Sequence, residues 1–279
     1  MEDYQNKLES LLIDTAKTLC DLYKAQNNKE NGVWNFGHVN DVDNQHMQLI
    51  FPKNGTEVRV SEQEARFCLA RYIEKSKIFF YSIETPTNKS YSFSSKSSVR
   101  HYMRARTDMT LYDQKHNPLF DIELKAENPA ETQSEGSTKE PKTRNFGNYS
   151  KDFFKLIMDD YDDKEKRCGV WFQVFTSGEN SKAKREAIAK NIKTAIDKLE
   201  EYTLVQWNDR NNNEKDKIRL DKAKIIEGNK KIVLAFCELN SNNNHCYKLI
   251  NNLTIEGFLN SEWAHKEIGE DSNGWISYK

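Results

Sequence analysis

Hydrophobic residues spaced three and four positions apart mark a long amphipathic helix at the start of the chain. One face of an α-helix returns about every 3.6 residues, so this spacing predicts a single packed helix over residues 1–27. Polar residues at 27–32 break the helix, and residues 33–60 mix aromatic and turn residues in the manner of short strands. The apolar stripe comprises Leu8, Leu11, Leu12, Leu19, Leu22 and Tyr23.

The segment Ser61-Glu62-Gln63-Glu64 predicts the start of a second helix, because its spacing is that of a capping box. Ser61 caps the first turn, and Glu64 reaches back to the backbone of Ser61. Glu62 falls beside the apolar stripe of this helix whereas Glu64 lies at its margin, so we expect Glu62 to point inward. The stripe passes through Ala65, Leu69, Tyr72 and Ile73.

Stretches rich in aromatic and β-branched residues follow and predict three main strands. The turn between Tyr112 and Leu119 is short enough to join the last two of them as an antiparallel hairpin. The main stretches cover residues 77–87, 105–113 and 118–128, with a shorter candidate at 91–94.

The second half of the chain alternates helical and strand patterns after a polar segment with Pro and Gly, which predicts a long mobile loop. A polar patch then separates a strongly basic helix from an apolar run typical of a buried strand. The pattern predicts an α/β fold. In order, the segments are the loop at 128–149, a helix at 150–161, a strand at 169–177, the basic helix at 181–202, the polar patch at 208–217 and the buried strand at 232–239.

Acidic and basic side chains converge on two neighbouring predicted strands. Asp108 lies in one of them, and residues 121–125, with the sequence DIELK, lie in the next. Successive side chains of a strand point to opposite faces, so Asp121, Glu123 and Lys125 share one face. Pairing in a hairpin brings Asp108 toward the same patch. Carboxylates and an ammonium gathered there are costly to desolvate unless a cation or a substrate completes the arrangement.

Such a set of side chains suits the hydrolysis of phosphodiesters. Carboxylate oxygens are hard ligands that hold Mg²⁺ together with waters and substrate phosphate. The bound cation neutralises charge and acidifies a water. An adjacent Lys orients that water or stabilises negative charge on the phosphorus oxygens. We therefore expect a hydrolase with Mg²⁺ as cofactor and Mn²⁺ as a substitute.

The motif resembles the signature of the PD-(D/E)xK nuclease superfamily, because Asp108 is followed after 14 residues by Glu123-Leu124-Lys125. The order of one helix, three strands, a helix and a strand is similar to the core of that superfamily. The resemblance implies a restriction-endonuclease-like αβββαβ core with a central mixed sheet flanked by helices. It also implies a metal held by Asp108, Glu123 and the Leu124 carbonyl, with Lys125 near the attacking water and Glu62 as the upstream helical acid.

Thr107 stands where the motif nominally has proline, which is a frequent variation. The sequence around residues 125–128, with Asp152-Phe153-Phe154-Lys155-Leu156 further on, also looks like stand-alone prokaryotic members of the group. We expect an N-terminal helical and strand extension at 1–60, the nuclease core at 61–202 and a C-terminal extension packed on the core at 203–279.

Several acids near the motif have two interpretations. Glu62 is either catalytic, or a first-turn acid that complements the helix dipole or pairs with Arg66. Glu64 is adequately explained by capping. Glu84 either lines the site or ends its strand, and we favour the latter. Asp121 is either a third metal ligand or a solvated edge residue.

Basic residues precede Asp108 and are candidates for gripping a nucleic-acid backbone. Arg106 shares the strand face of Asp108 and is the best of them, with Arg104 and Arg100 before it. Lys155, in the following helix, either touches phosphate or is solvated. The later basic helix presents either a phosphate-facing surface or a charged outer face, through Lys182, Lys184, Arg185, Lys190, Lys193 and Lys198.

Composition narrows the class of protein. Lys plus Arg number 42 and Asp plus Glu 43, so no global positive field exists and any nucleic-acid groove must be local. No apolar run approaches the roughly 20 residues of a membrane span, and the acidic N-terminus does not resemble a signal peptide. The five scattered cysteines predict reduced thiols, and the six histidines show no zinc-ligand spacing. We expect a cytoplasmic protein.

We therefore expect a metal-dependent endonuclease that acts on DNA, in prokaryotic defence against foreign DNA by analogy with the superfamily. The alternatives are an RNase or nickase using the same site, or a nucleic-acid-binding module with a nuclease fold controlled by a partner. Intact Asp108, Glu123 and Lys125 argue against loss of turnover. No interface signature decides whether the chain forms a homodimer, and a regulatory protein partner stays open.

Overall fold

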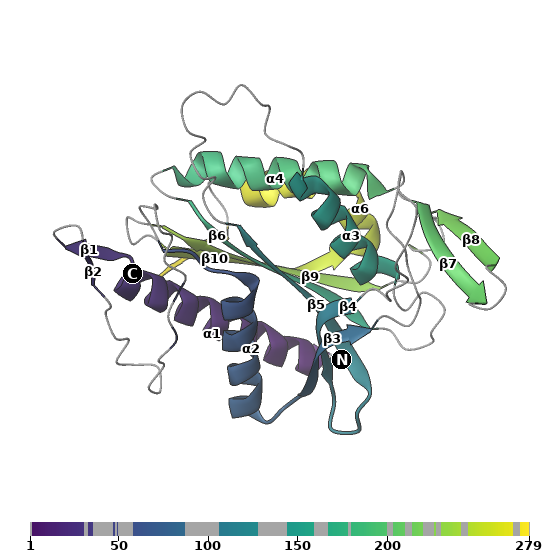
Figure 1. Cartoon of the computed structure of the whole chain (residues 1–279), viewed down its shortest axis with the longest axis horizontal. Coiled ribbons are helices and arrows are strands. Elements are labelled where there is room, and N and C mark those ends of the chain that lie inside the picture. The colour runs from purple at the N-terminus through teal and green to yellow at the C-terminus, as the bar shows by residue number, and fades with distance from the viewer. Residues whose placement is uncertain are drawn as a thin grey trace.

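A seven-stranded mixed sheet with helices on both faces forms the centre of the molecule (Figure 1). This arrangement is the α/β fold with a central mixed sheet that the sequence predicts. The computed structural model describes residues 2–30, 33–35, 47, 49, 58–86, 106–127, 144–158, 167–177, 180–199, 203–209, 214–219, 226, 230–240, 245–269 and 274–278.

The sheet combines an antiparallel half with a parallel centre. Strands β3, β4 and β5 form an antiparallel meander, β5 pairs with β6 in parallel, β6 pairs with β9 in parallel, and β10 and β11 add antiparallel strands at the far edge. In sheet order the strands are β11 (Ile276–Tyr278), β10 (His245–Thr254), β9 (Lys231–Leu239), β6 (Cys168–Thr176), β5 (Pro118–Glu127), β4 (Arg106–Tyr112) and β3 (Phe80–Pro86).

Helices divide the core into two apolar layers, one on each face of the sheet. Helices α1 (Glu2–Gln26) and α2 (Glu62–Ser76) cover one face, where Ile122 and Leu124 of β5 are fully buried (Figure 1). Helices α3 (Arg144–Met158) and α4 (Ser181–Asp197) cover the other face, where Trp171 of β6 is buried. The short elements α6 (Ile255–Leu259), α7 (Glu262–Ala264) and η2 (His265–Gly269) complete that second layer.

Strand β6 lies at the middle of the sheet, and all nine of its residues are buried. Parallel strands are covered on both faces by crossover helices, which explains why this segment is mostly apolar instead of alternating. The connection from β5 to β6 runs through α3, and the connection from β6 to β9 runs through α4.

The local patterns of the first half of the chain are confirmed. Helix α1 spans almost the whole predicted range, and Ser61 and Glu64 form the predicted capping box at the start of α2. Strands β3, β4 and β5 occupy the three main predicted stretches, and β4 and β5 pair as an antiparallel hairpin. The candidate strand at 91–94 lies outside the described residues.

The bounds of several segments predicted in the second half of the chain differ from those in the structure. Helix α3 begins at Arg144, so residues 144–149 are helical and not part of the predicted loop. Tyr149 explains the longer helix, because its side chain is 2% exposed, packs edge-on against Trp171 and accepts a hydrogen bond from Gln173. Burial of this aromatic ring offsets the weak helix propensity of the surrounding Asn and Gly residues.

The polar patch at 208–217, which the sequence analysis leaves without secondary structure, contributes its ends to a hairpin. Strands β7 (Thr203–Asp209) and β8 (Glu214–Arg219) pair antiparallel as a separate two-stranded sheet, and β1 (Asn28–Glu30) pairs with β2 (Val33–Asn35) in the same way. The basic helix predicted at 181–202 ends at Asp197. The segment 203–279, expected as an extension, supplies β9, β10 and β11 to the central sheet.

All five cysteines are free, as the sequence predicts. No helix among the described ranges combines the length and the apolar character needed to cross a membrane.

Candidate active site

The site lies where strands β4 and β5 part. Their register pairs Met109 with Ile122, and β5 then continues beside β6 up to Glu127. Asp108 comes immediately before Met109, the first residue of β4 that pairs with β5. The Oδ2 of Asp108 accepts the backbone N–H of Leu124 at 2.7 Å. A side-chain carboxylate thus takes the hydrogen bond that a neighbouring strand would otherwise provide, which orients Asp108 toward β5.

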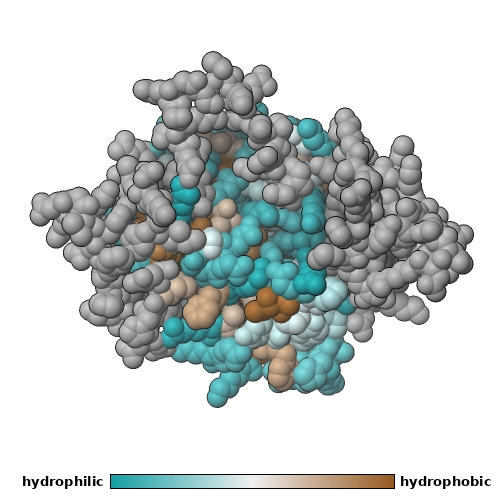
Figure 2. Space-filling model, in the orientation of Figure 1, coloured by the Kyte–Doolittle hydropathy of each residue, from teal (hydrophilic) through white to brown (hydrophobic). Residues whose placement is uncertain are grey.

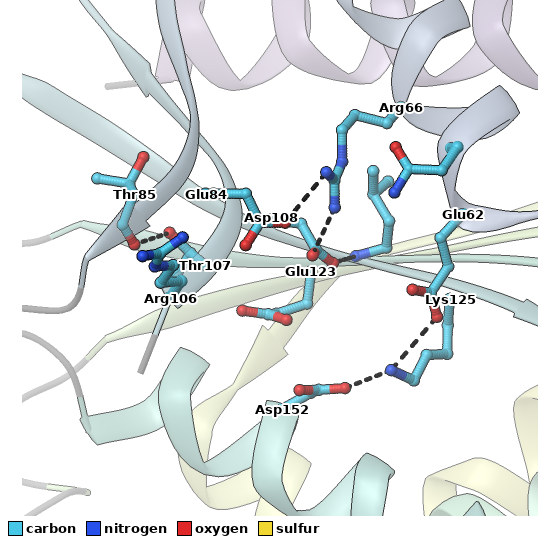
Figure 3. Close-up of polar contacts among 12 residues, drawn as sticks. Glu62, Arg66, Glu84, Thr85, Arg106, Thr107, Asp108, Glu123, Lys125 and Asp152 are labelled. Atoms are coloured by element: carbon cyan, nitrogen blue, oxygen red, sulfur yellow. Dashed lines mark hydrogen bonds and ion pairs between the residues drawn. The ribbon is translucent and has the colours of Figure 1, made fainter. Parts of the chain in front are cut away.

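Arg66 of α2 joins two carboxylates above this opening (Figure 3). Its Nη2 donates to Asp108 Oδ1 at 2.8 Å, and its Nη1 lies 3.1 Å from Glu84 Oε1. The Asp108 side chain is 17% exposed, whereas the Glu84 side chain is 46% exposed. The pair with Asp108 is therefore the more shielded of the two, and such charge-assisted hydrogen bonds strengthen as water is excluded.

Glu123 projects from β5 toward α3 and is 1% exposed. Its Oε2 accepts from Lys155 Nζ at 2.7 Å, while its Oε1 is buried without a hydrogen-bond partner. The same ammonium reaches Asp152 Oδ1 at 3.0 Å and the Arg106 carbonyl at 2.8 Å. Lys155 is therefore the counter-charge of Glu123, and one oxygen of Glu123 is left to bind another group.

Lys125 follows on the same face of β5 and lies between two further acids (Figure 3). Its Nζ is 2.5 Å from Asp152 Oδ2 and 3.5 Å from Glu62 Oε1. Asp152 of α3 thus contacts both Lys125 and Lys155, one through each oxygen. Helix α2 supplies Glu62 from one side of the opening and α3 supplies Asp152 from the other.

Burial and mutual repulsion shape the proton affinities of the site. Burial raises the pKa of Glu123 well above its ordinary value, and the charge of Asp152 raises it further while Lys155 opposes the rise. Burial likewise raises the pKa of Glu62. For Lys125 and Lys155 burial lowers the pKa, but the surrounding carboxylates, led by Asp152 for Lys125 and Glu123 for Lys155, outweigh it, so both ammonium groups keep a raised pKa.

The predicted catalytic set is brought together, and one of its neighbours is not. Glu62, Lys125 and Glu123 belong to one chain of ion pairs that runs through Asp152 and Lys155. Asp108 pairs with Arg66 and is joined to β5 by the hydrogen bond from the Leu124 N–H. Asp121 belongs elsewhere, because its Oδ1 accepts from Thr110 and its Oδ2 faces Arg167 at 3.6 Å. Since Asp121 is 1% exposed, it is not a solvated edge residue either.

The structure also assigns the remaining acids of helix α2 and strand β3. Glu64 accepts the backbone N–H of Ser61 at 2.8 Å, which is the capping role predicted for it. Glu62 does not pair with Arg66, which binds Asp108 and Glu84 instead. Glu84 lies inside β3, so the favoured prediction that it ends the strand is wrong.

The basic residues predicted to contact nucleic acid differ in their exposure and in their partners. Arg106 is exposed at the start of β4, whereas Arg104 and Arg100 lie outside the described residues. Lys155 is 5% exposed and bound to acids, so it is not solvated. Helix α4 is not a uniformly basic outer face, because Arg185 is buried against Glu238.

Arg66 and Asp152 are members of the site, although the sequence analysis assigned neither of them a role in it. A local signal existed for each: Arg66 is one turn after Glu62 on the same helix, and Asp152 is one turn before Lys155. Residues four and three positions apart share a helix face. The pattern alone nevertheless cannot show that these faces meet the strand pair.

The donor set fits one divalent cation, although no group of three His, Cys, Asp or Glu residues in the described part of the chain is arranged to hold a metal ion. Five carboxylates and three cationic groups leave two negative charges uncompensated when all are ionised. The unpartnered Oε1 of Glu123 is a free oxygen ligand for such a cation. The carboxylates are Glu62, Glu84, Asp108, Glu123 and Asp152, and the cations are Arg66, Lys125 and Lys155.

A pocket of about 770 Å³ adjoins the site between α2 and β3. Arg66 lines it together with the aromatic side chains of Phe67 and Tyr81 and with Ile83. Phe67 is 57% and Ile83 47% exposed, and Figure 2 shows hydrophobic residues breaking the hydrophilic surface over these two elements. Arg66 thus contacts both the pocket and Asp108.

Comparison with known proteins gives no relative: no family model, no curated protein and no solved structure matches the chain.

Proposed function

We propose that the chain is a metal-dependent nuclease with a restriction-endonuclease-like core. The convergence of Asp108, Glu123 and Lys125 where β4 and β5 part carries the proposal. The element order α2, β3, β4, β5, α3, β6 supports it, because one helix, three strands, a helix and a strand are the order expected for the PD-(D/E)xK superfamily.

The residues divide the work of phosphodiester hydrolysis between them. Asp108 and Glu123 would hold Mg²⁺, or Mn²⁺ as a substitute, and the role predicted for the Leu124 carbonyl stays a prediction. When bound, the cation neutralises phosphate charge and acidifies a water. Lys125, kept charged by its carboxylate neighbours, orients the attacking water and stabilises charge on the phosphorus oxygens. The water oxygen bonds to phosphorus and gives up a proton, the bond to the 3′ oxygen breaks, and the 3′ oxygen takes up a proton as it leaves.

The surroundings of the site favour a polyanionic substrate. Arg106 is exposed at the start of β4, and the pocket beside Arg66 offers exposed aromatic and aliphatic side chains on which a base can stack. We propose DNA as the substrate and defence against foreign DNA as the setting. An RNase or a nickase on the same residues is an outcome of the experiment below.

A cleavage assay with matched variants tests the proposal. Purified protein is incubated with supercoiled plasmid, single-stranded DNA and RNA, each with Mg²⁺, Mn²⁺ or EDTA. We expect metal-dependent cleavage that is lost in Glu123→Gln and Lys125→Met. Glu127→Gln is the control, because Glu127 lies on the same strand but pairs with Lys184. Cleavage that persists in the first two variants, or that resists EDTA, would overturn the proposal.

A further inference from the structure

Glu84 adopts a backbone conformation that a strand residue rarely has. Its φ is 54°, although it lies inside β3 between Ile83, which pairs with Met109, and Thr85, which pairs with Thr107. A positive φ is unfavourable for a residue with a Cβ atom and tends to persist where the surrounding structure imposes it, often at functional sites.

The two other non-glycine residues with positive φ in the described part of the chain have ordinary explanations. Lys77 caps the C-terminus of α2, and His116 lies in the turn between β4 and β5. Left-handed conformations are common at both kinds of position. Glu84 is the exception, and it lies in register beside Asp108.

The carboxylate of Glu84 is held by the guanidinium that also holds Asp108. Arg66 donates to Asp108 at 2.8 Å and lies 3.1 Å from Glu84 through its other terminal nitrogen. A divalent cation on Asp108 would be repelled by the charge of Arg66 at that carboxylate. Arg66 is 8% exposed and its Nε has no hydrogen-bond partner, so moving the guanidinium away from every acid would cost free energy.

We infer that Glu84 is a positioning residue that retains Arg66 when a divalent cation takes Asp108. Glu84 is already in contact, so Arg66 exchanges one carboxylate for another without becoming unpaired. The strained backbone of Glu84 places its carboxylate within reach of Arg66 from the strand next to Asp108. The inference rests on the metal site of the proposed function.

A Mn²⁺ titration of the full-length chain tests the inference without any substrate. Binding is measured as the loss of the electron paramagnetic resonance signal of free Mn²⁺. We expect Arg66→Met to bind Mn²⁺ about tenfold more tightly than wild type, because the competing charge is gone. Glu84→Gln should bind about fivefold more weakly, a coupling of the size usual between neighbouring groups. In the double variant the effect of Glu84→Gln should disappear, because Arg66 no longer needs an acceptor.

The outcomes separate this inference from the proposed function. If wild type binds no Mn²⁺, the metal site and the inference both fall. If wild type binds Mn²⁺ and Asp108→Ala does not, but Glu84→Gln is unchanged, the inference alone is overturned. An equal loss of affinity from Glu84→Gln with and without Arg66 would show that Glu84 acts on the cation directly, and would also overturn it. Because Glu84 is exposed, its variants can be measured even where Arg66→Met does not fold.

A glycine substitution separates positioning from a merely structural role. Glu84→Gly relieves the backbone strain and removes the carboxylate, so we expect a thermal midpoint no lower than wild type together with weaker Mn²⁺ binding. His116→Gly is the matched control, because it relieves a similar φ in the β4–β5 turn and should leave Mn²⁺ binding unchanged. A lower midpoint in Glu84→Gly, or normal Mn²⁺ binding, would contradict the inference.

Discussion

Asp108 accepts the backbone N–H of Leu124 at 2.7 Å across the opening between β4 and β5. This single contact joins the two halves of the sequence motif, since Asp108 belongs to one strand and Leu124 separates Glu123 from Lys125 on the next. It gives Asp108 a structural duty in addition to its proposed role as a metal ligand.

The two duties of Asp108 can be separated by substitution. Asp108→Asn keeps an oxygen that accepts the Leu124 N–H but removes the charge, so we expect a folded protein whose metal-dependent cleavage falls by at least ~100-fold. Asp108→Ala also leaves a buried N–H unsatisfied and should lower the free energy of unfolding by a further ~1–3 kcal/mol. Urea unfolding and cleavage rates measure the two effects. Equal stability of the two variants would contradict the structural duty.

Asp152 should control the protonation of Lys125. Its carboxylate is the largest influence that raises the pKa of Lys125 against burial. We expect Asp152→Asn to lower that pKa, so the alkaline limb of the pH–rate profile should move to lower pH. The cleavage rate near neutral pH should fall roughly 10- to 100-fold, as for a misaligned catalytic group. A slower variant with an unmoved alkaline limb would mean that Asp152 only supports the packing of α3.

His245 should make the fold less stable in mild acid. Burial, aided by Lys24, lowers the pKa of His245 from 6.5 to about 4. The folded state therefore resists a proton that the unfolded chain accepts, so stability is complete above pH 6.5 and is lost as the pH falls toward 4. This group should cost about 2 kcal/mol of unfolding free energy between pH 7 and pH 5.

The variant His245→Gln cannot titrate in this range but can still accept the Asn240 N–H that His245 accepts at 3.1 Å. Its unfolding free energy, measured in urea at both pH values, should change by about 2 kcal/mol less than that of wild type. An identical pH dependence in the two proteins would assign the acid sensitivity to other groups.

Arg185 should be needed for stability and not for binding of an anionic substrate. It donates to Glu238 at 2.6 Å and stacks over Trp275 at 4.1 Å, and Glu238 is fully buried. Arg185→Met leaves that carboxylate without its counter-charge, which should cost about 3–5 kcal/mol.

Urea unfolding tests this expectation with Lys182→Met as the control, because Lys182 is exposed on the same helix and should change stability by less than about 0.5 kcal/mol. Addition of Glu238→Leu to Arg185→Met should restore part of the loss, since the unpaired charge is then gone. A mild effect of Arg185→Met, equal to that of Lys182→Met, would show that the buried pair contributes little.

The elements with strong local patterns could be predicted from the sequence. Each of three signals is a property of residues close together in the sequence: the capping box at Ser61 and Glu64, the apolar periodicity of α1, and the mostly apolar run of β6. The hairpin of β7 and β8 could not, because residues 208–217, which join and partly form the two strands, are polar, and the pairing depends on the partner strand. The early start of α3 likewise depends on Trp171, a residue of β6 that Tyr149 meets only in the folded chain.

The sequence by itself determined that Asp108, Glu123 and Lys125 occupy adjacent strands, with Glu123 and Lys125 on one face, because side-chain alternation along a strand is local. Only the tertiary structure decided which charges balance them. The contacts of Arg66 with Asp108 and of Asp152 with Lys125 join residues 42 and 27 positions apart. They exist because α2 and α3 pack beside the opening of the sheet, a relationship that no local spacing encodes.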